Sequence, residues 1–175
     1  MKNTLIKKVS VVAVCVLAGS AWCAPRIYNT GFEDANRGWK FAEEYSIVEK
    51  GGVNNSKALY VKREKSGKSD GAAWQFASIE GGKKYKVSCQ IKADITLKGK
   101  YKVGAGFTLT IRDSKKVIKN FYPVCCFDST NGEWKTVEYT FTAPENSRTC
   151  EIRVGLYPGF LGQAWFDDVK IEEIK

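Results

Sequence analysis

Two carboxylate-bearing segments lie near opposite ends of the chain, and each adjoins an apolar, strand-like run. Glu33 closes segment 29–33, while Asp167 and Asp168 interrupt the apolar segment 164–171. An antiparallel fold that brings its first and last strands together would gather Glu33 and Asp167 into one oxygen-rich site. Carboxylate and carbonyl oxygens are the ligands that calcium takes in proteins. The sequence therefore predicts a calcium site where the two ends of the domain meet.

Backbone carbonyls are expected to complete this calcium shell. They come from Thr30 and from the turn at 55–57, which includes Lys57, and Asp168 is an alternative to Asp167 as a ligand. Strand alternation puts Asp167 on the side of the apolar residues that follow it, where an unpaired carboxylate is costly. This favours a bound ion, although two surface carboxylates paired with lysines remain the alternative.

Short runs of alternating apolar and polar residues recur along the chain and are separated by Gly, Asn, Asp, Ser or Pro. Strands are predicted at residues 26–32, 46–49, 58–63, 72–78, 85–93, 104–112, 117–121, 136–142, 151–156 and 164–174. No long segment has the periodicity of a helix. The pattern indicates an all-β sandwich or barrel.

Four motifs, in this order, connect the pattern with a known family. They are NTGFE at 29–33 with a following Trp39, GKKYKVS at 82–88, EWKTVEYTFTAP at 133–144, and WFDDVKI at 165–171. The arrangement resembles the carbohydrate-binding modules of families 4, 9, 16 and 22. This resemblance implies an all-β fold, a two-sheet antiparallel jelly-roll β-sandwich of galactose-binding-domain-like topology. It also implies that the calcium is structural and lies away from the sugar, and that Trp39 and Trp134 are core residues.

A sugar site needs flat aromatic rings that stack on the apolar side of a pyranose. The predicted stacking residues are Trp74, Tyr122 and Tyr157, with Phe160 behind them. For Trp74 an inward position beside Phe76, with Gln75 exposed, is an equal alternative. Trp165 shares the inward parity of Asp167 and is expected to be structural.

Sugar hydroxyls also need planar polar groups as partners. Gln90, Arg112 and Arg153 are the predicted hydrogen-bonding residues, because alternation puts them on the polar sides of strands expected to form one concave sheet. Ordinary cross-strand or solvated pairing is the alternative for all of them.

The first residues have the layout of a secretory signal peptide: lysines, an apolar run at 9–18, and then small residues. We predict a signal peptide at 1–23, too short for a comfortable membrane span, and one sandwich domain at 24–175. Cleavage after Ala21 or near Cys23 both fit. The protein is expected to be secreted or periplasmic and monomeric.

The formal net charge is +9, and the lysines are dispersed rather than clustered. Dispersed lysines are typical of a solvated surface, and attraction to an acidic polysaccharide is the functional alternative. Nucleic acid is not expected as a partner. Cys89 and Cys150 alternate with core positions and are expected to be buried. Together with Cys125 and Cys126 they allow three disulfide connectivities, which the sequence does not distinguish.

The chain contains no histidine, which excludes Ser-His-Asp and Cys-His catalysis. Asp167 and Asp168 are expected on opposite faces of a strand, a poor geometry for the paired carboxylates of a glycosidase. The predicted function is therefore a secreted, non-catalytic carbohydrate-binding module that binds a poly- or oligosaccharide on one sheet face and contains a structural calcium site. The alternative is an exported structural or adhesive protein that uses the same sandwich for protein contacts.

Overall fold

The computed structural model describes residues 25–65, 71–97, 104–113, 116–121 and 129–175. Their elements are β1 (Lys40–Phe41), β2 (Tyr45–Val48), the 3-10 helix η1 (Val53–Asn55), β3 (Ala58–Arg63), β4 (Ala73–Ser78), β5 (Lys84–Leu97), β6 (Ala105–Arg112), β7 (Val117–Phe121), β8 (Lys135–Thr142), β9 (Thr149–Leu156) and β10 (Leu161–Ile174). None of the helices in these ranges is long and apolar enough to cross a membrane. The predicted signal peptide lies outside the described residues.

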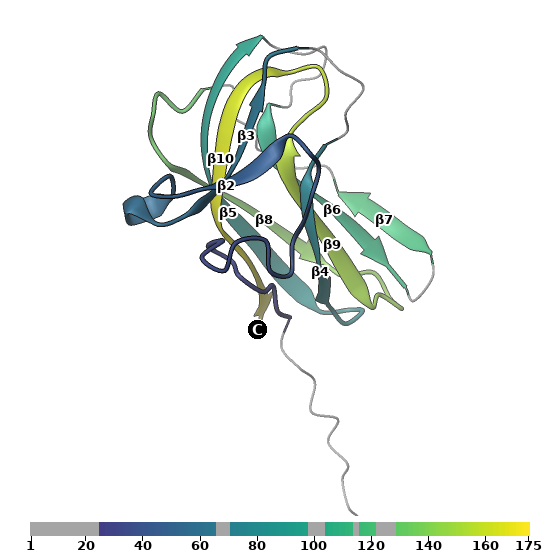
Figure 1. Cartoon of the computed structure of the whole chain (residues 1–175). Coiled ribbons are helices and arrows are strands. Elements are labelled where there is room, and N and C mark those ends of the chain that lie inside the picture. The colour runs from purple at the N-terminus through teal and green to yellow at the C-terminus, as the bar shows by residue number, and fades with distance from the viewer. Residues whose placement is uncertain (1–24, 66–70, 98–103, 114–115, 122–128) are drawn as a thin grey trace, which may run out of the picture.

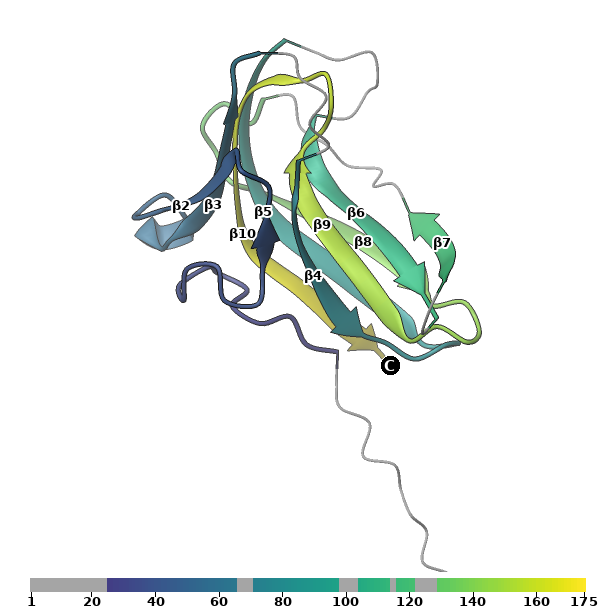
Figure 2. The same cartoon turned by 45° about the vertical axis from the view of Figure 1, so that its right-hand side comes forward.

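The strands form two antiparallel sheets of five strands that face each other (Figures 1 and 2). The first sheet has the order β1-β4-β9-β6-β7, and the second has the order β2-β3-β10-β5-β8. Most neighbours within a sheet are distant in sequence, so the chain crosses repeatedly between the layers. The prediction of an all-β, two-sheet antiparallel sandwich is confirmed.

Strand alternation fills the space between the sheets with apolar side chains. The fully buried residues include Ile91 on β5, Leu109 and Ile111 on β6, and Ile152 on β9. Cys89 and Cys150 belong to the same core as free, buried thiols. Because burial disfavours the thiolate, the pKa of each thiol is raised and both stay protonated. Cys125 and Cys126 lie outside the described residues.

The strand predicted at 26–32 is wrong, because this segment is a series of bends and turns that packs on the sandwich. Two buried aromatic rings anchor it: the centroids of Phe32 and Trp39 are 5.2 Å apart. The indole Nε1 of Trp39 donates a hydrogen bond to the carbonyl of Asn29 at 3.1 Å. The core position predicted for Trp39 is thus confirmed, and its NH group is satisfied by the segment that it anchors.

A β-bulge near the middle of β10 changes which alternate side chains of the strand point into the core. The register with β5 shifts between Asp167 and Lys170, and Asp168 has a positive φ of 50°. Before the bulge Phe166 points inward and Trp165 outward, whereas after it Val169 points inward. A bulge adds one residue to a strand and reverses the parity beyond it. The prediction that Trp165 shares the inward side with Asp167 is therefore wrong.

Candidate functional site

The outer face of the first sheet carries a row of one aromatic, one cationic and one hydroxyl side chain. Trp74 on β4 is directly opposite Arg153 on β9, and Arg153 is directly opposite Thr108 on β6. Paired residues of antiparallel strands project to the same side, so the three side chains are neighbours. The guanidinium carbon of Arg153 lies 5.8 Å from the centroid of the Trp74 ring.

A second row runs beside the first. Phe76 on β4 is opposite Glu151 on β9, which is opposite Thr110 on β6. Phe76 is 47% exposed, so β4 presents two aromatic rings on this face. Between them, Gln75 points inward and is buried. The outward alternative for Trp74 is thus confirmed, and the exposed position considered for Gln75 is wrong.

Gln75 is buried because its amide group binds the backbone of the N-terminal segment. Its Oε1 accepts a hydrogen bond from the backbone N–H of Tyr28 at 2.6 Å, and its Nε2 donates to the carbonyl of Tyr28 at 3.0 Å. Both polar ends of the amide are therefore satisfied inside the sandwich. These two hydrogen bonds fix which side of β4 points into the sandwich. The neighbouring positions, Trp74 and Phe76, therefore point to the outer surface.

Glu151 is a buried carboxylate held between two arginines. Its side chain is 3% exposed, its Oε2 accepts a hydrogen bond from Nη2 of Arg112 at 3.0 Å, and its Oε1 pairs with Nε of Arg153. One carboxylate cannot neutralise two guanidinium groups, so a positive charge remains on this face. Within the described residues, the buried Nε of Arg112 has no hydrogen-bond partner. Glu151 thus fixes the position of both arginines, and their partly exposed side chains still offer N–H donors to a ligand.

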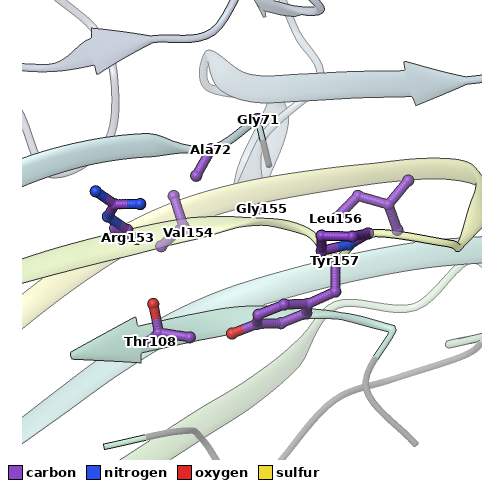
Figure 3. Close-up of a pocket in the computed structure, with 9 residues that line it drawn as sticks. Gly71, Ala72, Thr108, Arg153, Val154, Gly155, Leu156 and Tyr157 are labelled. Carbon is purple, nitrogen blue, oxygen red and sulfur yellow. The ribbon is translucent and has the colours of Figure 1, made fainter. Parts of the chain in front are cut away.

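A hollow of about 440 Å³ adjoins the end of the first row. Its walls include Ala72, Thr108, Arg153 and Tyr157. Figure 3 shows these side chains around the hollow, with the hydroxyl end of the Tyr157 ring directed toward Thr108. The predicted residues Trp74, Arg153 and Tyr157 are therefore positioned along one surface.

A buried arginine from the second sheet holds the wall that contains Tyr157. Arg63 is 6% exposed, and its Nη1 donates to the carbonyls of Leu156 at 3.1 Å and Tyr157 at 2.9 Å. Its other nitrogens bind the carboxylate of Glu44. The charge of Arg63 is thus paired, and its remaining donors fix the backbone at the end of β9.

Tyr45 holds the opposite wall of the same hollow. Its hydroxyl donates to the carbonyl of Gly71 at 2.8 Å and accepts from the backbone N–H of Leu156 at 3.0 Å. Burial raises the pKa of Tyr45, so the hydroxyl stays protonated and keeps its donor role. A Cβ at Gly155 would lie 2.4 Å from the hydroxyl oxygen, so this backbone passes too close to Tyr45 for a larger residue.

Three of the predicted calcium ligands, Thr30, Glu33 and Asp167, come together away from the Trp74 row, whereas Lys57 does not line the same hollow. A separate hollow is lined by Thr30, Glu33, the turn at 53–56, Asp167 and Asp168. Glu33 accepts a hydrogen bond through Oε1 from the backbone N–H of Lys57 at 3.0 Å, so the turn lies against the N-terminal segment. The carbonyl of Thr30 accepts from the N–H of Val169 at 3.0 Å, which joins this segment to β10.

The buried carboxylate of Asp167 is the centre of this junction. Its Oδ2 accepts hydrogen bonds from the N–H of Val53 at 2.8 Å and the hydroxyl of Ser56 at 2.9 Å, and its Oδ1 accepts from the N–H of Asp168 at 2.7 Å. Burial raises the pKa of Asp167, while these three donors act in the opposite direction. The cost of burying this carboxylate is therefore offset by protein donors, which removes one reason for inferring an ion.

The oxygens of this hollow nevertheless fit a hard cation. Glu33 is exposed, and one hydrogen bond leaves Oδ1 of Asp167 with acceptor capacity. In the described parts of the chain, no group of three or more His, Cys, Asp or Glu side chains could hold a metal ion. A calcium ion at this hollow would therefore need backbone carbonyls, including that of Thr30, beside the carboxylates.

Comparison with known proteins decides the family of the chain. The model of the family described as "Carbohydrate binding domain" (CBM_4_9) matches residues 24–159. The chain belongs to this carbohydrate-binding domain family. No curated protein matches it.

Solved structures of other carbohydrate-binding domains share the fold of this one. The CBM22-1–GH10 modules of a Clostridium thermocellum endo-1,4-beta-D-xylanase, complexed with xylohexaose, are 21% identical over 82% of this chain and 28% of that chain, with a TM-score of 0.54. The CBM22-1 xylan-binding domain of Paenibacillus barcinonensis Xyn10C is 13% identical over 83% and 92% of the two chains, with a TM-score of 0.59. A CBM4 structure is 18% identical over 85% and 100%, with a TM-score of 0.58. This domain thus spans 28% of the xylanase chain and nearly all of the isolated modules.

Other predicted ligand residues of this carbohydrate-binding domain lie elsewhere. Gln90 is on β5 in the second sheet, and its Nε2 donates to Oγ1 of Thr136 at 3.0 Å. The expectation that Gln90 shares a face with Arg112 and Arg153 is therefore wrong, because β6 and β9 belong to the first sheet. Tyr122 lies outside the described residues, and Phe160 is buried.

Trp134 is not a core residue, and that expectation is wrong as well. Its ring is partly exposed, as is that of Trp165, and both lie near the ammonium of Lys92 on the outer face of the second sheet. Four members of the two rows on the first sheet were not among the predicted ligand residues: Phe76, Glu151, Thr108 and Thr110. The signal for Phe76 was its shared parity with Trp74 on β4.

Proposed function

We propose that this carbohydrate-binding domain binds a poly- or oligosaccharide on the outer face of the first sheet, without catalysing a reaction. The row of Trp74, Arg153 and Thr108, ending at the hollow beside Tyr157, is the observation that carries this proposal. The aromatic ring supplies a stacking surface for a pyranose, and the guanidinium and hydroxyl groups supply hydrogen bonds to its hydroxyls.

The acid–base chemistry of the face supports binding without catalysis. Glu151 is the carboxylate of these rows, and each of its oxygens is engaged by an arginine. A glycosidase needs two carboxyl groups on opposite sides of the scissile bond, one of which carries a proton. Because each oxygen of Glu151 already binds an arginine, neither is free to act on a glycosidic bond.

Two further properties belong to the proposal. The protein acts outside the cytoplasm, as the layout of residues 1–23 suggests. The hollow at Glu33 and Asp167 binds a structural calcium ion that joins the N-terminal segment to β10, remote from the saccharide. The oxygen ligands described above and their position between the two ends of the domain support this assignment.

The test is retardation of the purified domain in native gels that contain one soluble polysaccharide each, at moderate salt to screen nonspecific attraction. Xylan and other β-1,4-linked polymers come first, because one similar domain is described as xylan-binding and another belongs to xylanase modules complexed with xylohexaose. Substitution Trp74→Ala should abolish retardation, and Trp74→Phe should restore part of it. Tyr28→Ala is the matched control, because Tyr28 is an exposed ring, 63% accessible, on the N-terminal segment.

The proposal would be contradicted if no polymer retards the domain although a cooperative thermal unfolding transition shows that the domain is folded. The protein-contact alternative would then become the better account, with the exposed ring of Phe76 as its first interface residue.

A further inference from the structure

The outer face of the second sheet carries its own row of aromatic and cationic side chains. Trp165 on β10 is directly opposite Tyr60 on β3 and Lys92 on β5. The ring centroids of Tyr60 and Trp165 are 5.1 Å apart. Trp134 extends the row, because it precedes β8, whose residue Lys135 pairs with Ile91. The bulge in β10 turns Trp165 outward and so creates this row.

Lys92 is held between the two indoles. Its Nζ lies 4.7 Å from the centroid of Trp165 and 5.2 Å from that of Trp134. No carboxylate of the described residues forms an ion pair with it, whereas Lys62, Lys86 and Lys170 on the same face each pair with an acidic neighbour. The ammonium is thus positioned by aromatic rings and its charge is not neutralised.

A hollow of about 480 Å³ adjoins this ammonium. Lys92, Asp94, Ser129, Asn131, Gln163 and Trp165 are among the residues that line it. Tyr60 donates to Oε1 of Gln163 at 3.0 Å, which orients the amide and leaves its N–H groups without an acceptor among the described residues. The hollow therefore combines an aromatic ring, an unneutralised cation and an oriented amide donor.

The far wall of the hollow is fixed to the sheet by a buried threonine. The Oγ1 of Thr130 accepts from the N–H of Ala93 at 3.2 Å, and the N–H of Thr130 donates to the carbonyl of Ala93 at 2.9 Å. Thr130 is 3% exposed. Asn131, which follows it, is therefore held beside β5 before any ligand arrives, which lowers the ordering cost of binding.

We propose that this hollow is a second saccharide site, and that it takes a uronic-acid-containing saccharide. The pyranose lies against Trp165, its carboxylate pairs with Lys92, and its hydroxyls bind Gln163, Asn131 and Asp94. The charge of Lys92 selects the acidic sugar, because Lys92 forms no ion pair with Asp94 of the same hollow or with any other carboxylate of the described residues. This site is on the sheet opposite to the Trp74 row and does not depend on it.

The experiment is calorimetric titration of the domain with short oligogalacturonates, oligomannuronates and glucuronate-containing oligomers, with neutral xylo-oligosaccharides of equal length in parallel. Lys92→Gln should weaken uronate binding about tenfold, the size of a charge-assisted hydrogen bond. Lys86→Gln is the matched control, because it removes the same charge from the same face of β5. It should change the affinity less than twofold.

A second pair of variants separates the two sites. Trp165→Ala should lose uronate binding and keep neutral binding, and Trp74→Ala should do the reverse. If Trp165→Ala unfolds, Lys92→Gln carries the test, because Lys92 forms no ion pair with the described residues whose loss would destabilise the domain.

Three results would overturn the second site: no uronate oligomer binds, Lys92→Gln and Lys86→Gln lose the same affinity, or Trp74→Ala abolishes uronate binding. A different result would contradict only the proposed role of the first sheet: neither the wild type nor any variant binds a neutral oligomer, while uronate binding still depends on Lys92. The second site would then remain supported.

Discussion

Trp74 and Arg153 are directly opposed on β4 and β9, and the guanidinium carbon of Arg153 lies 5.8 Å from the centroid of the Trp74 ring. The same guanidinium also pairs through Nε with the buried carboxylate of Glu151. A cation close to an aromatic ring is attracted to its π electrons, so Arg153 connects the stacking surface to a fixed anchor. The face is thus ordered before a ligand arrives, and less conformational freedom is lost on binding.

Glu151→Gln tests this anchor. The amide keeps the shape of the carboxylate, but it can accept through only one oxygen, so one of the two guanidinium groups loses its acceptor. We expect the free energy of unfolding to fall by about 1–3 kcal/mol, the cost of a buried group without its partner. Binding of a neutral glycan should weaken severalfold, because Arg153 is no longer held beside Trp74. Chemical denaturation and titration with a xylo-oligosaccharide measure the two effects.

Glu138→Gln is the control for that substitution, since Glu138 is an exposed residue that pairs with Lys86 on the second sheet. It should leave both stability and neutral-glycan binding nearly unchanged. Equal behaviour of the two variants would mean that the carboxylate of Glu151 does not organise the face.

Gly155→Ala tests the close packing under the first hollow. The added Cβ would lie 2.4 Å from the hydroxyl oxygen of Tyr45 and 3.3 Å from Cα of Ala72. Overpacking of this kind costs about 1–3 kcal/mol. Tyr45→Phe removes the hydroxyl and with it the bonds to Gly71 and Leu156, so it is destabilising by itself. The double variant should be more stable than the sum of the single effects predicts, because the main clash has gone.

Urea denaturation of the two single variants and the double variant gives the interaction energy of this cycle. Strict additivity would show that the backbone at Gly155 moves away from Tyr45 and that the hydroxyl does not constrain the hollow.

Local alternation predicted much of this fold from the sequence. In β6 and β9 the side chains alternate as expected, with Leu109 and Ile152 inward and Arg153 outward. The same rule failed at Trp165, because the bulge at Asp167 and Asp168 reverses the parity of β10. Nothing in the apolar pattern marks a bulge, since residues on both sides of it remain apolar where they face the core.

The failure at Gln90 has a different cause. Alternation tells which side of its own strand a residue occupies, and Gln90 does face outward as expected. Alternation does not tell which sheet the strand joins, because the pairing of β5 with β10 and β8 is between segments that are distant in sequence. The rows of the first sheet depend on pairing of β4, β6 and β9, which the sequence alone did not provide.

The pH dependence of stability should carry a signature of Asp167. Burial raises the pKa of this carboxyl in the folded state above the value of about 3.9 that an unfolded aspartate has. Between the two pKa values the folded state binds more protons than the unfolded state, so this group's contribution to stability falls as the pH rises through that window. Asp167→Asn removes the titration and should flatten this part of the profile.

Asp167→Asn should also be less stable than the wild type near neutral pH, since an amide N–H₂ would face one of the donors that the carboxylate now accepts from. Denaturation midpoints measured in chelator from pH 3 to pH 7 give both effects. A stability difference between the two proteins that grows as the pH rises would mean that the hydrogen bonds outweigh burial and that the folded pKa is lowered instead.

Calcium should oppose this trend, because it binds the ionised carboxylates. At pH 7 a site on Glu33, Asp167 and the carbonyl of Thr30 would stabilise the fold by about 2.7 kcal/mol when free calcium exceeds its Kd about 100-fold. Removal by a chelator should lower Tm, and Glu33→Gln should lose the response. Asp34→Asn is the matched control, because Asp34 adjoins Glu33 and pairs with Arg37 outside the hollow. A Tm that does not change with calcium would mean that protein hydrogen bonds are sufficient to hold this junction together, namely those from Val53 and Ser56 to Asp167 and from Val169 to Thr30.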